Sequence, residues 1–239
     1  MKPSLSVVVL CYKAGESITP FVGQMISAIE QAHVNFELVL VGNYNRGDTE
    51  DSTPRVVRAL AAADPRVKAV TLEKQGWMGW DARSGMGAAN GEVIVLIDGD
   101  NQMPPEDVAQ VYARMQDSRA DIVTTYRVTR GDGIYRRIQS YGYNLIFRVL
   151  FPGIAARDVN SKPKLIRREL FDKFTLISDD WFIDAEIMIQ ARRYRAHIEE
   201  IPTVFLPVVG RRSFVKLSAV WEFVANLTRA RIREFFIRP

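Results

Sequence analysis

VIVLIDGD, at residues 93–100, is the most informative stretch of this sequence. Its first five residues are apolar and mostly β-branched, a pattern typical of a strand buried on both faces. Asp98 and Asp100 follow directly, and side chains two residues apart in an extended chain point to the same side. Open α/β sheets bind ligands at the carboxyl ends of their strands. We therefore expect this carboxylate pair to face a ligand.

Asp98 and Asp100 predict a metal site. Two carboxylates on one side of a chain repel each other unless a cation lies between them. A hard divalent cation with oxygen ligands, Mg²⁺ or Mn²⁺, bridging a diphosphate fits this arrangement. The chain has one cysteine and two histidines, which excludes a zinc site built from these residues. The alternative interpretation is an ordinary turn, because Asp, Gly and Asn are common loop residues.

Strand and helix patterns alternate on both sides of this stretch. In the first half we expect strands at 5–11, 37–41, 67–72, 93–97 and 121–126, separated by helices at 17–32, 52–63, 79–90 and 104–116. This alternation predicts an α/β fold with a doubly wound, mostly parallel sheet. The second half is less regular, with helices expected at 135–151, 184–194 and 217–236 and strands at 162–168 and 198–206.

The bulk composition narrows the class of protein. A length of 239 residues suits one α/β domain, and a hydrophobic content of 47% is ample for a core. The net charge of +4 permits an anionic partner, but the basic residues form no continuous stripe, so we expect no nucleic acid. No apolar run approaches about 18 residues, which argues against a membrane span. The single cysteine and the absence of a signal-peptide pattern favour a reducing, cytoplasmic location.

Two stretches resemble family 2 of the inverting glycosyltransferases, which have the GT-A fold. SVVVLCYKAGE at 6–16 is similar to the family's first strand and nucleotide-receiving loop. ANGEVIVLIDGDNQMPPE at 89–106 is similar to its metal motif and the helix that follows. The resemblance runs across nearly the whole chain and is closest to the polyprenyl- and dolichyl-phosphate sugar synthases. It implies a metal-dependent inverting transfer of a sugar from a nucleoside-diphosphate sugar, UDP- or GDP-linked.

The resemblance also implies a division of the chain. A GT-A glycosyltransferase domain is expected at 1–212. Its Rossmann-like half at 1–126 is expected to bind the nucleotide sugar, and its second half at 127–212 the acceptor. A C-terminal amphipathic helical segment is expected at 213–239.

Several donor-binding residues follow from the resemblance. Asp98 and Asp100 are expected to hold Mg²⁺ or Mn²⁺, and Asp98 and Gly99 to contact the donor diphosphate. Tyr12 and Glu16 lie in the loop expected to receive the nucleotide.

Two other parts of the donor half are expected to contact substrate. Asn43 ends the second strand where the family usually has an acidic pair, so the base, usually uracil or guanine, stays open. Asp48 and Asp51 are interpreted as caps of the next helix. The glycine-punctuated loop at 75–83 leads into a helix, and such a start presents N–H groups to anions. Arg83 is expected to add a bidentate charge for a phosphate.

The acceptor half carries an arginine and a departure from the family pattern. Arg127 resembles the family's arginine after the fifth strand, which in the lipid-phosphate synthases belongs to a region that meets the acceptor phosphate. Its planar fork matches phosphate oxygens. The segment 158–164, DVNSKPK, resembles the family segment that lines the acceptor side, with Asn160 as a candidate contact. It has Ser-Lys-Pro where the family commonly has Ser-Gly-Phe, which leaves the acceptor's identity open.

Asp184 and Glu186 are the candidate catalytic acids. They open a helix, and the family places a functional acid at this point. Residues two apart on a helix do not share a face, so one of them is expected to be structural, paired with Arg192 or Arg193.

A late basic element completes the expected site. VGRRSFVK at 209–216 resembles the family's Arg…Ser-Lys element, which closes over the diphosphate. Arg211, Arg212 and Lys216 are expected to offset the charge that develops on the leaving diphosphate. The spacing is altered, so the choice between the two arginines stays open.

The residues do not fix the acceptor. A sugar hydroxyl needs a general base. A lipid phosphate, with a second pKa of about 6, is already ionised and needs positioning arginines instead. The basic, aromatic-rich helices expected at 134–151 and 217–236 suit an anionic membrane surface, or else dock on the core or in a homodimer.

We expect transfer to polyprenyl phosphate by a peripheral enzyme at the inner face of the cell membrane. Two alternatives remain. One is a glycosyltransferase that acts on a glycan hydroxyl. The other is a non-catalytic module that binds a sugar nucleotide or a membrane.

Overall fold

A computed structural model describes residues 2–130, 134–154, 156–206 and 218–236 of the chain. These residues build a seven-stranded sheet. The strands are β1 (Leu5–Leu10), β2 (Phe36–Val41), β3 (Val67–Val70), β4 (Val93–Asp98), β5 (Ile122–Arg130), β6 (Lys164–Arg167) and β7 (Ile198–Phe205). Their order across the sheet is β3-β2-β1-β4-β6-β5-β7. All neighbours pair in parallel except β6, which is antiparallel to both β4 and β5.

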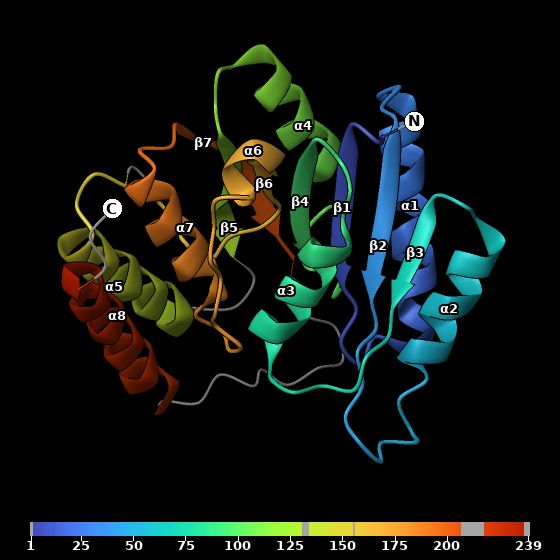
Figure 1. Ribbon diagram of the computed structural model, residues 1–239, viewed down its shortest axis with the longest axis horizontal. Helices are drawn as coiled ribbons and strands as arrows, with labels where there is room; N and C mark the ends of the chain where they lie inside the picture. The colour runs from blue at the N-terminus through green and yellow to red at the C-terminus, as the bar shows by residue number, and fades with distance from the viewer. Residues whose placement is uncertain (1, 131–133, 155, 207–217, 237–239) are drawn as a thin grey trace.

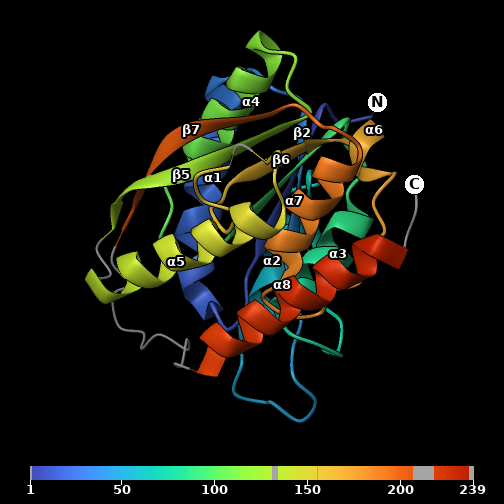
Figure 2. The same cartoon turned by 90° about the vertical axis from the view of Figure 1, so that its left-hand side faces the viewer.

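Helices cover both faces of the sheet (Figure 1). They are α1 (Ile18–Gln31), α2 (Thr53–Ala63), α3 (Met78–Ala88), α4 (Asp107–Asp117), α5 (Ile134–Leu150), α6 (Arg168–Phe171), α7 (Ile183–Arg193) and α8 (Ser218–Phe236), with a 3-10 turn, η1, at Gly15–Ser17. α1, α2 and α4 share a core with one face, and α3, α6 and α7 share a core with the other. α5 and α8 lie side by side (Figure 2) and, with α7, build a third core.

Strand β1 illustrates why the sheet forms. All six of its residues are buried. Leu5, Val7 and Val9 face the core with α1, while Val8 and Leu10 face the core with α3. Each such side chain contributes about 1.5–3 kcal/mol when it leaves water. A run that is apolar at five of its six positions therefore fits a central parallel strand that is covered on both faces.

The C-terminal helix α8 docks on the rest of the chain. Leu227 is fully buried in the third core beside Phe147 of α5. The Asn226 Nδ2 group donates a hydrogen bond to Asp180 Oδ2 at 3.0 Å. Glu234 near the end of α8 forms ion pairs with two arginines of α7. One side of α8 therefore packs on the core, as one of the sequence interpretations proposed.

The structure confirms the predicted fold class and places most elements within a few residues of their expected bounds. It also adds detail. The strand expected at 162–168 is β6, and it inserts between β4 and β5. Asp51 Oδ1 accepts from the Thr53 N–H at 3.0 Å, at the start of the helix that Asp51 was interpreted to cap, whereas the Ser52 side chain makes no capping bond.

Candidate functional site

The Asp-Gly-Asp turn lies at the carboxyl end of β4. Asp98 is the last residue of that strand and pairs with Leu10 of β1. The Gly99 N–H donates to Leu10 O at 2.9 Å, and a Cβ on Gly99 would lie 2.6 Å from the Ile18 side chain. A side chain between the two carboxylates would therefore require the Ile18 side chain to move. Asn101 follows with a φ of 60°, and the chain turns away from the sheet.

Asp98 has a partner that the sequence did not predict. The Lys162 ammonium lies 3.2 Å from Asp98 Oδ2 and 2.9 Å from Asp184 Oδ2. Lys162 is only 2% exposed. Lys162 is the lysine of the Ser-Lys-Pro sequence that departs from the family pattern. This departure is the one feature of the sequence that could have drawn attention to Lys162. A fixed positive charge therefore stands beside the predicted metal motif.

Asp184 is buried between two lysines. Lys164 Nζ lies 2.7 Å from Asp184 Oδ1 and also donates to Val159 O at 2.9 Å. Burial alone would raise the pKa of Asp184, but the ammonium groups of Lys162 and Lys164 outweigh it and hold that pKa below its usual value. The same burial lowers the pKa of Lys164. Asp184 is thus an ionised anchor whose two oxygens are both engaged.

Glu186 supports a loop. Its carboxylate accepts from the Ile177 N–H at 3.1 Å and from the Ser178 N–H at 2.9 Å. The predicted pairing with Arg192 or Arg193 is wrong, because both arginines bind Glu234 of α8, as described above. Arg192 instead fastens α7 to α8, and Glu186 fastens the loop that precedes α7.

The start of α3, where the sequence predicted an anion site, is partly engaged within the protein. The N–H groups of Trp77 and Trp80 both donate to Asp179 O, at 2.7 and 3.3 Å. Gly79 packs so tightly that a Cβ would lie 2.4 Å from a carbonyl oxygen of the same loop, that of Ser178. Arg83 forms an ion pair with the Asp179 carboxylate. The loop at 178–180 therefore packs against the start of α3 and against Arg83, both of which the sequence assigned to a phosphate.

The Asn43 side chain is buried and bonded to residues of α3 and of the segment after β3. It is 1% exposed, and its amide donates to Asp81 Oδ1 at 2.9 Å and to Ser84 Oγ at 3.0 Å. Its Oδ1 accepts from the Leu72 N–H at 2.8 Å. Asp81 also pairs with Lys74. Because its donors are used inside the protein, Asn43 orders the loops around the pocket, and its expected contact with substrate stays a prediction.

Tyr12 and Glu16 both follow β1, in different surroundings. The Tyr12 hydroxyl accepts from Asn45 Nδ2 at 3.3 Å, and the Lys74 ammonium lies 4.7 Å from the centre of its ring. Tyr12 therefore lies at the carboxyl end of the sheet beside the Asn43 cluster. Glu16 is exposed and forms a surface ion pair with Arg55 at 2.7 Å.

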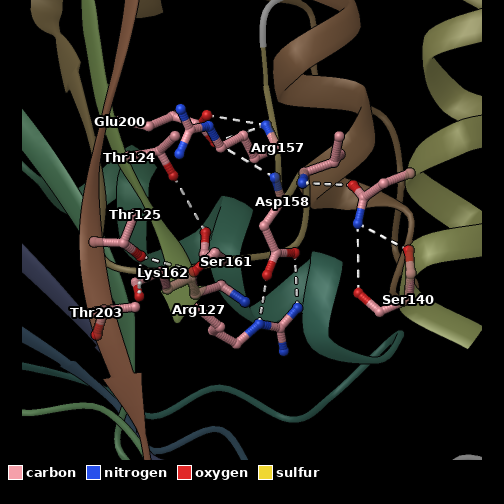
Figure 3. Close-up of polar contacts among 12 residues, drawn as sticks. Thr124, Thr125, Arg127, Ser140, Arg157, Asp158, Ser161, Lys162, Glu200 and Thr203 are labelled. Atoms are coloured by element: carbon pink, nitrogen blue, oxygen red, sulfur yellow. Dashed lines mark hydrogen bonds and ion pairs between the residues drawn. The ribbon is translucent and has the colours of Figure 1, made fainter. Parts of the chain in front are cut away.

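Arg127 of β5 faces the segment 158–164 (Figure 3). Its guanidinium binds Asp158 through two bonds, from Nε at 2.6 Å and from Nη2 at 2.7 Å. A cavity of about 190 Å³ opens beside this pair. The residues that line it are Tyr126, Arg127, Ser140, Tyr141, Asn144, Arg148, Arg157 and Asp158. Three arginines and one aspartate make this cavity cationic.

The segment 158–164 is held rigidly against β5. Thr125 Oγ1 lies 2.7 Å from Ser161 Oγ and donates to Lys162 O at 2.6 Å (Figure 3). Next to these residues, the Asn160 Oδ1 atom is buried and has no hydrogen-bond partner among the residues that the structure describes. Buried polar atoms are normally satisfied, so a ligand that donates a hydrogen bond would fit there.

The predicted late element, Arg211, Arg212 and Lys216, lies outside the described residues. Leu206, the last described residue before this element, contacts the loop that carries the metal motif. The Leu206 N–H donates to Gln102 O at 2.8 Å, and Gln102 Nε2 donates back to Leu206 O at 3.2 Å. The chain after β7 is therefore fastened to the loop that carries the metal motif.

The carboxylate pair suits a hard cation. In the described parts of the chain, no group of three or more Asp, Glu, His or Cys side chains is placed to hold a metal ion. Asp98 and Asp100 offer oxygen donors, and Asp100 Oδ1 accepts from the Gln102 N–H at 3.1 Å. Mg²⁺ and Mn²⁺ commonly take only one or two carboxylates and complete their shell with phosphate and water. The two residues fit such an ion.

The fold is that of the GT-A glycosyltransferases. The crystal structure of glucosyl-3-phosphoglycerate synthase from Mycobacterium tuberculosis with Mn²⁺, UDP and glucosyl-3-phosphoglycerate matches with a TM-score of 0.72 and 16% identity, over 96% of this chain and 80% of that one. The same synthase with Mg²⁺ and UDP gives 0.69 and 17% identity, over 96% and 79%. At such identity the likeness establishes the fold alone.

The sequence comparison gives the family. Residues 6–176 match the family model described as glycosyl transferase family 2, and the chain belongs to that family, as predicted. An undecaprenyl-phosphate 4-deoxy-4-formamido-L-arabinose transferase of Pseudomonas syringae pv. syringae (strain B728a) is 29% identical over 70% of this chain and 48% of its own length. A transferase of the same name from Salmonella choleraesuis (strain SC-B67) is 26% identical over 70% and 50%. The chain thus spans about half the length of these relatives.

Proposed function

We propose that this chain transfers a sugar from a UDP- or GDP-linked donor to polyprenyl phosphate, with Mg²⁺ or Mn²⁺ at Asp98 and Asp100. Family membership and the relatives named as undecaprenyl-phosphate transferases support the reaction. The structural neighbours named with UDP and Mn²⁺ or Mg²⁺ support the nucleotide and the metal. The observation that carries the choice of acceptor is the double pairing of Asp184 with buried lysines.

The acids around α7 are engaged within the protein. Asp184 binds two lysines and Glu186 binds two backbone N–H groups. Asp179 binds Arg83, and Asp180 accepts from the Phe182 N–H and from Asn226. A hydroxyl acceptor needs a carboxylate that is free to take its proton. A phosphate acceptor brings its own negative charge at neutral pH, so this arrangement favours a phosphate.

The cationic cavity next to Arg127 is the proposed place of the acceptor phosphate. Arg148 and Arg157 line it together with Arg127, and arginine forks match phosphate oxygens. On the adjacent α5, Tyr141 and Val149 are exposed apolar side chains, at 66% and 72%. A charged pocket beside an apolar helix face suits an amphiphile with a phosphate head and a hydrocarbon tail.

The donor end supplies the other half of the reaction. A divalent ion bound by Asp98 and Asp100 would neutralise charge on the leaving nucleoside diphosphate. Gly99 keeps the two carboxylates close to the carboxyl ends of the strands, and Tyr12 lies at the same end of the sheet. The buried Asn160 Oδ1, which has no partner among the described residues, is a proposed acceptor for a hydrogen bond from the sugar. The residues at 211, 212 and 216 keep their proposed role at the diphosphate.

We place the enzyme at the cytoplasmic face of the membrane as a peripheral protein. No helix in the described part of the chain is both long and apolar enough to cross a bilayer. The exposed apolar stripe of α5 includes Ile138, Tyr141, Leu145 and Val149, spaced three or four residues apart along one helix side. Such a stripe with arginines nearby suits an anionic membrane surface. A homodimer is the other use that this surface would allow.

An acceptor comparison tests the proposal. The purified chain is incubated with labelled UDP- and GDP-sugars and Mn²⁺, and with either polyprenyl phosphate or the matching polyprenol. The two lipids differ only in the phosphate. We expect label in the organic phase with polyprenyl phosphate alone, and its loss in Asp100→Ala but not in Asp117→Ala, which removes an exposed carboxylate of α4.

Other outcomes would replace the proposal. Transfer to a soluble glycan, with no lipid product, would mean a hydroxyl acceptor. Binding of a sugar nucleotide without turnover on any acceptor would mean a non-catalytic module.

A further inference from the structure

The predicted metal motif is in contact with a positively charged side chain of the protein itself, that of Lys162. Lys162 Nζ lies 3.2 Å from Asp98 Oδ2, on the segment 158–164 that Thr125 fastens to β5. The Lys162 side chain is 3% exposed, whereas that of Asp98 is 25% exposed. The ammonium is therefore part of the wall of the site, and the carboxylate is the part that a ligand can reach.

Lys162 is locked in place by a chain of alternating charges. Asp184 Oδ2 holds Lys162 at 2.9 Å, and Asp184 Oδ1 is held in turn by Lys164 at 2.7 Å. The four groups, Asp98, Lys162, Asp184 and Lys164, carry two negative and two positive charges. Buried charges persist only when they are paired in this way. Before any ligand binds, the charge of Asp98 is thus already balanced.

This balance changes what a divalent cation meets. A metal ion that approaches without a nucleotide is attracted by the carboxylates of Asp98 and Asp100. It is repelled by the Lys162 ammonium, which lies 3.2 Å from Asp98 Oδ2. A metal ion that arrives with a diphosphate brings negative charge with it. The ammonium has three N–H donors, so it can remain on Asp184 and turn another donor from Asp98 to a phosphate oxygen.

We propose that Lys162 couples the metal to the donor: it weakens binding of the free divalent cation and contacts the diphosphate when both bind together. This inference rests on the proposed donor site but not on the identity of the acceptor. Lys162 is then a donor-binding residue, and Asp184 and Lys164 are the residues that position it. The coupling keeps the carboxylate pair from retaining a metal ion after the nucleoside diphosphate leaves.

Metal binding measured without turnover tests this. The full chain is titrated with Mn²⁺ alone, and with Mn²⁺ plus UDP or GDP, while free Mn²⁺ is followed by electron paramagnetic resonance. We expect the wild type to bind Mn²⁺ weakly alone and at least about tenfold more tightly with the matching nucleotide. In Lys162→Met the affinity for Mn²⁺ alone should rise about tenfold, since a like charge is removed. The increase that the nucleotide causes should shrink.

Two further variants control for folding and for net charge. Lys68→Met also removes a lysine from an ion pair, with Glu37, at the opposite end of the strands, and should leave Mn²⁺ binding unchanged. Lys162→Gln repeats the neutral substitution with a polar side chain, and thermal unfolding establishes that each variant is folded.

Two outcomes would overturn the inference. One is tight binding of Mn²⁺ by the wild type without nucleotide. The other is a folded Lys162 variant with wild-type binding both alone and with nucleotide. Failure of the proposed function would look different: the coupling would be present, but no lipid-linked product would form.

Discussion

Replacing Asp184 by Asn should destabilise the protein strongly. The substitution removes a negative charge that pairs with both Lys162 and Lys164, and both ammonium groups are buried. Breaking a buried ion pair from one side typically costs about 3–5 kcal/mol of unfolding free energy. For a domain of this size, 1 kcal/mol corresponds to roughly 2–4 °C in melting temperature, so the loss should be roughly 6–20 °C. Asp172→Asn is the matched control, because Asp172 is 60% exposed and lies 3.6 Å from Arg168, so its pair should contribute less than about 1 kcal/mol.

The pH dependence of the unfolding free energy provides a second test of the role of Asp184. The pKa of Asp184 in the folded protein lies below the ordinary value of 3.8, because two ammonium groups outweigh the effect of burial. A lowered folded-state pKa adds stability above the unfolded value, and that stability is lost as pH falls through the folded value. The difference between wild type and Asp184→Asn should therefore persist from pH 8 to pH 5 and narrow only below about pH 4.

Urea unfolding of both variants across this range is the assay. A variant within about 1 kcal/mol of the wild type at pH 7 would refute the reasoning. If that stable variant also lost turnover by 10²–10⁴-fold, the range typical of general bases, Asp184 would be a base and the acceptor a hydroxyl.

Three other changes test separate parts of the site. Asp100→Asn should abolish binding of the Mn²⁺–nucleotide complex, measured by calorimetry, and leave the melting temperature almost unchanged. Arg148→Ala should raise the KM for polyprenyl phosphate by roughly tenfold and leave the KM for the donor alone, because one charge-assisted phosphate contact contributes about 1.5 kcal/mol or more; equal effects on both would contradict the cavity assignment. Gly79→Ala should cost about 1–3 kcal/mol in urea unfolding, because its Cβ would lie 2.4 Å from Ser178 O, and an unchanged midpoint would mean that this loop yields freely.

Much of the fold could be predicted because its signal is local. The strand at 93–97 is apolar at every position, and every position is buried between two layers of helices. The carboxylates that follow it lie at the strand end for the same reason. A pattern of consecutive residues was enough for both conclusions.

The missed features are contacts between residues far apart in the chain. Lys162 meets Asp98 across 64 residues, and no spacing pattern encodes such a pair. The start of α3 looked free to bind a phosphate because the loop at 178–180, which covers it, comes about 100 residues later. Asn43 donates to Asp81 and Ser84, which lie 38 and 41 residues further along the chain. Contacts between distant parts of the chain decide which polar groups remain available to bind a ligand. A single sequence does not show which distant residues come into contact.

The inserted strand β6 sets a distance. It lies between β4, which ends at Asp98, and β5, which carries Arg127, and neighbouring strands are spaced by about 4.8 Å. β6 pairs with β4 up to Leu96 and with β5 at Ile122 and Val123, so β4 and β5 are about two strand spacings apart, roughly 10 Å, just before the chain reaches the metal motif and Arg127. The segment 158–164 leads into β6 between them. The sheet therefore separates the proposed site of the leaving group from the proposed site of the nucleophile. Under the proposed function, side chains of segment 158–164 would contact the sugar between the donor and acceptor phosphates.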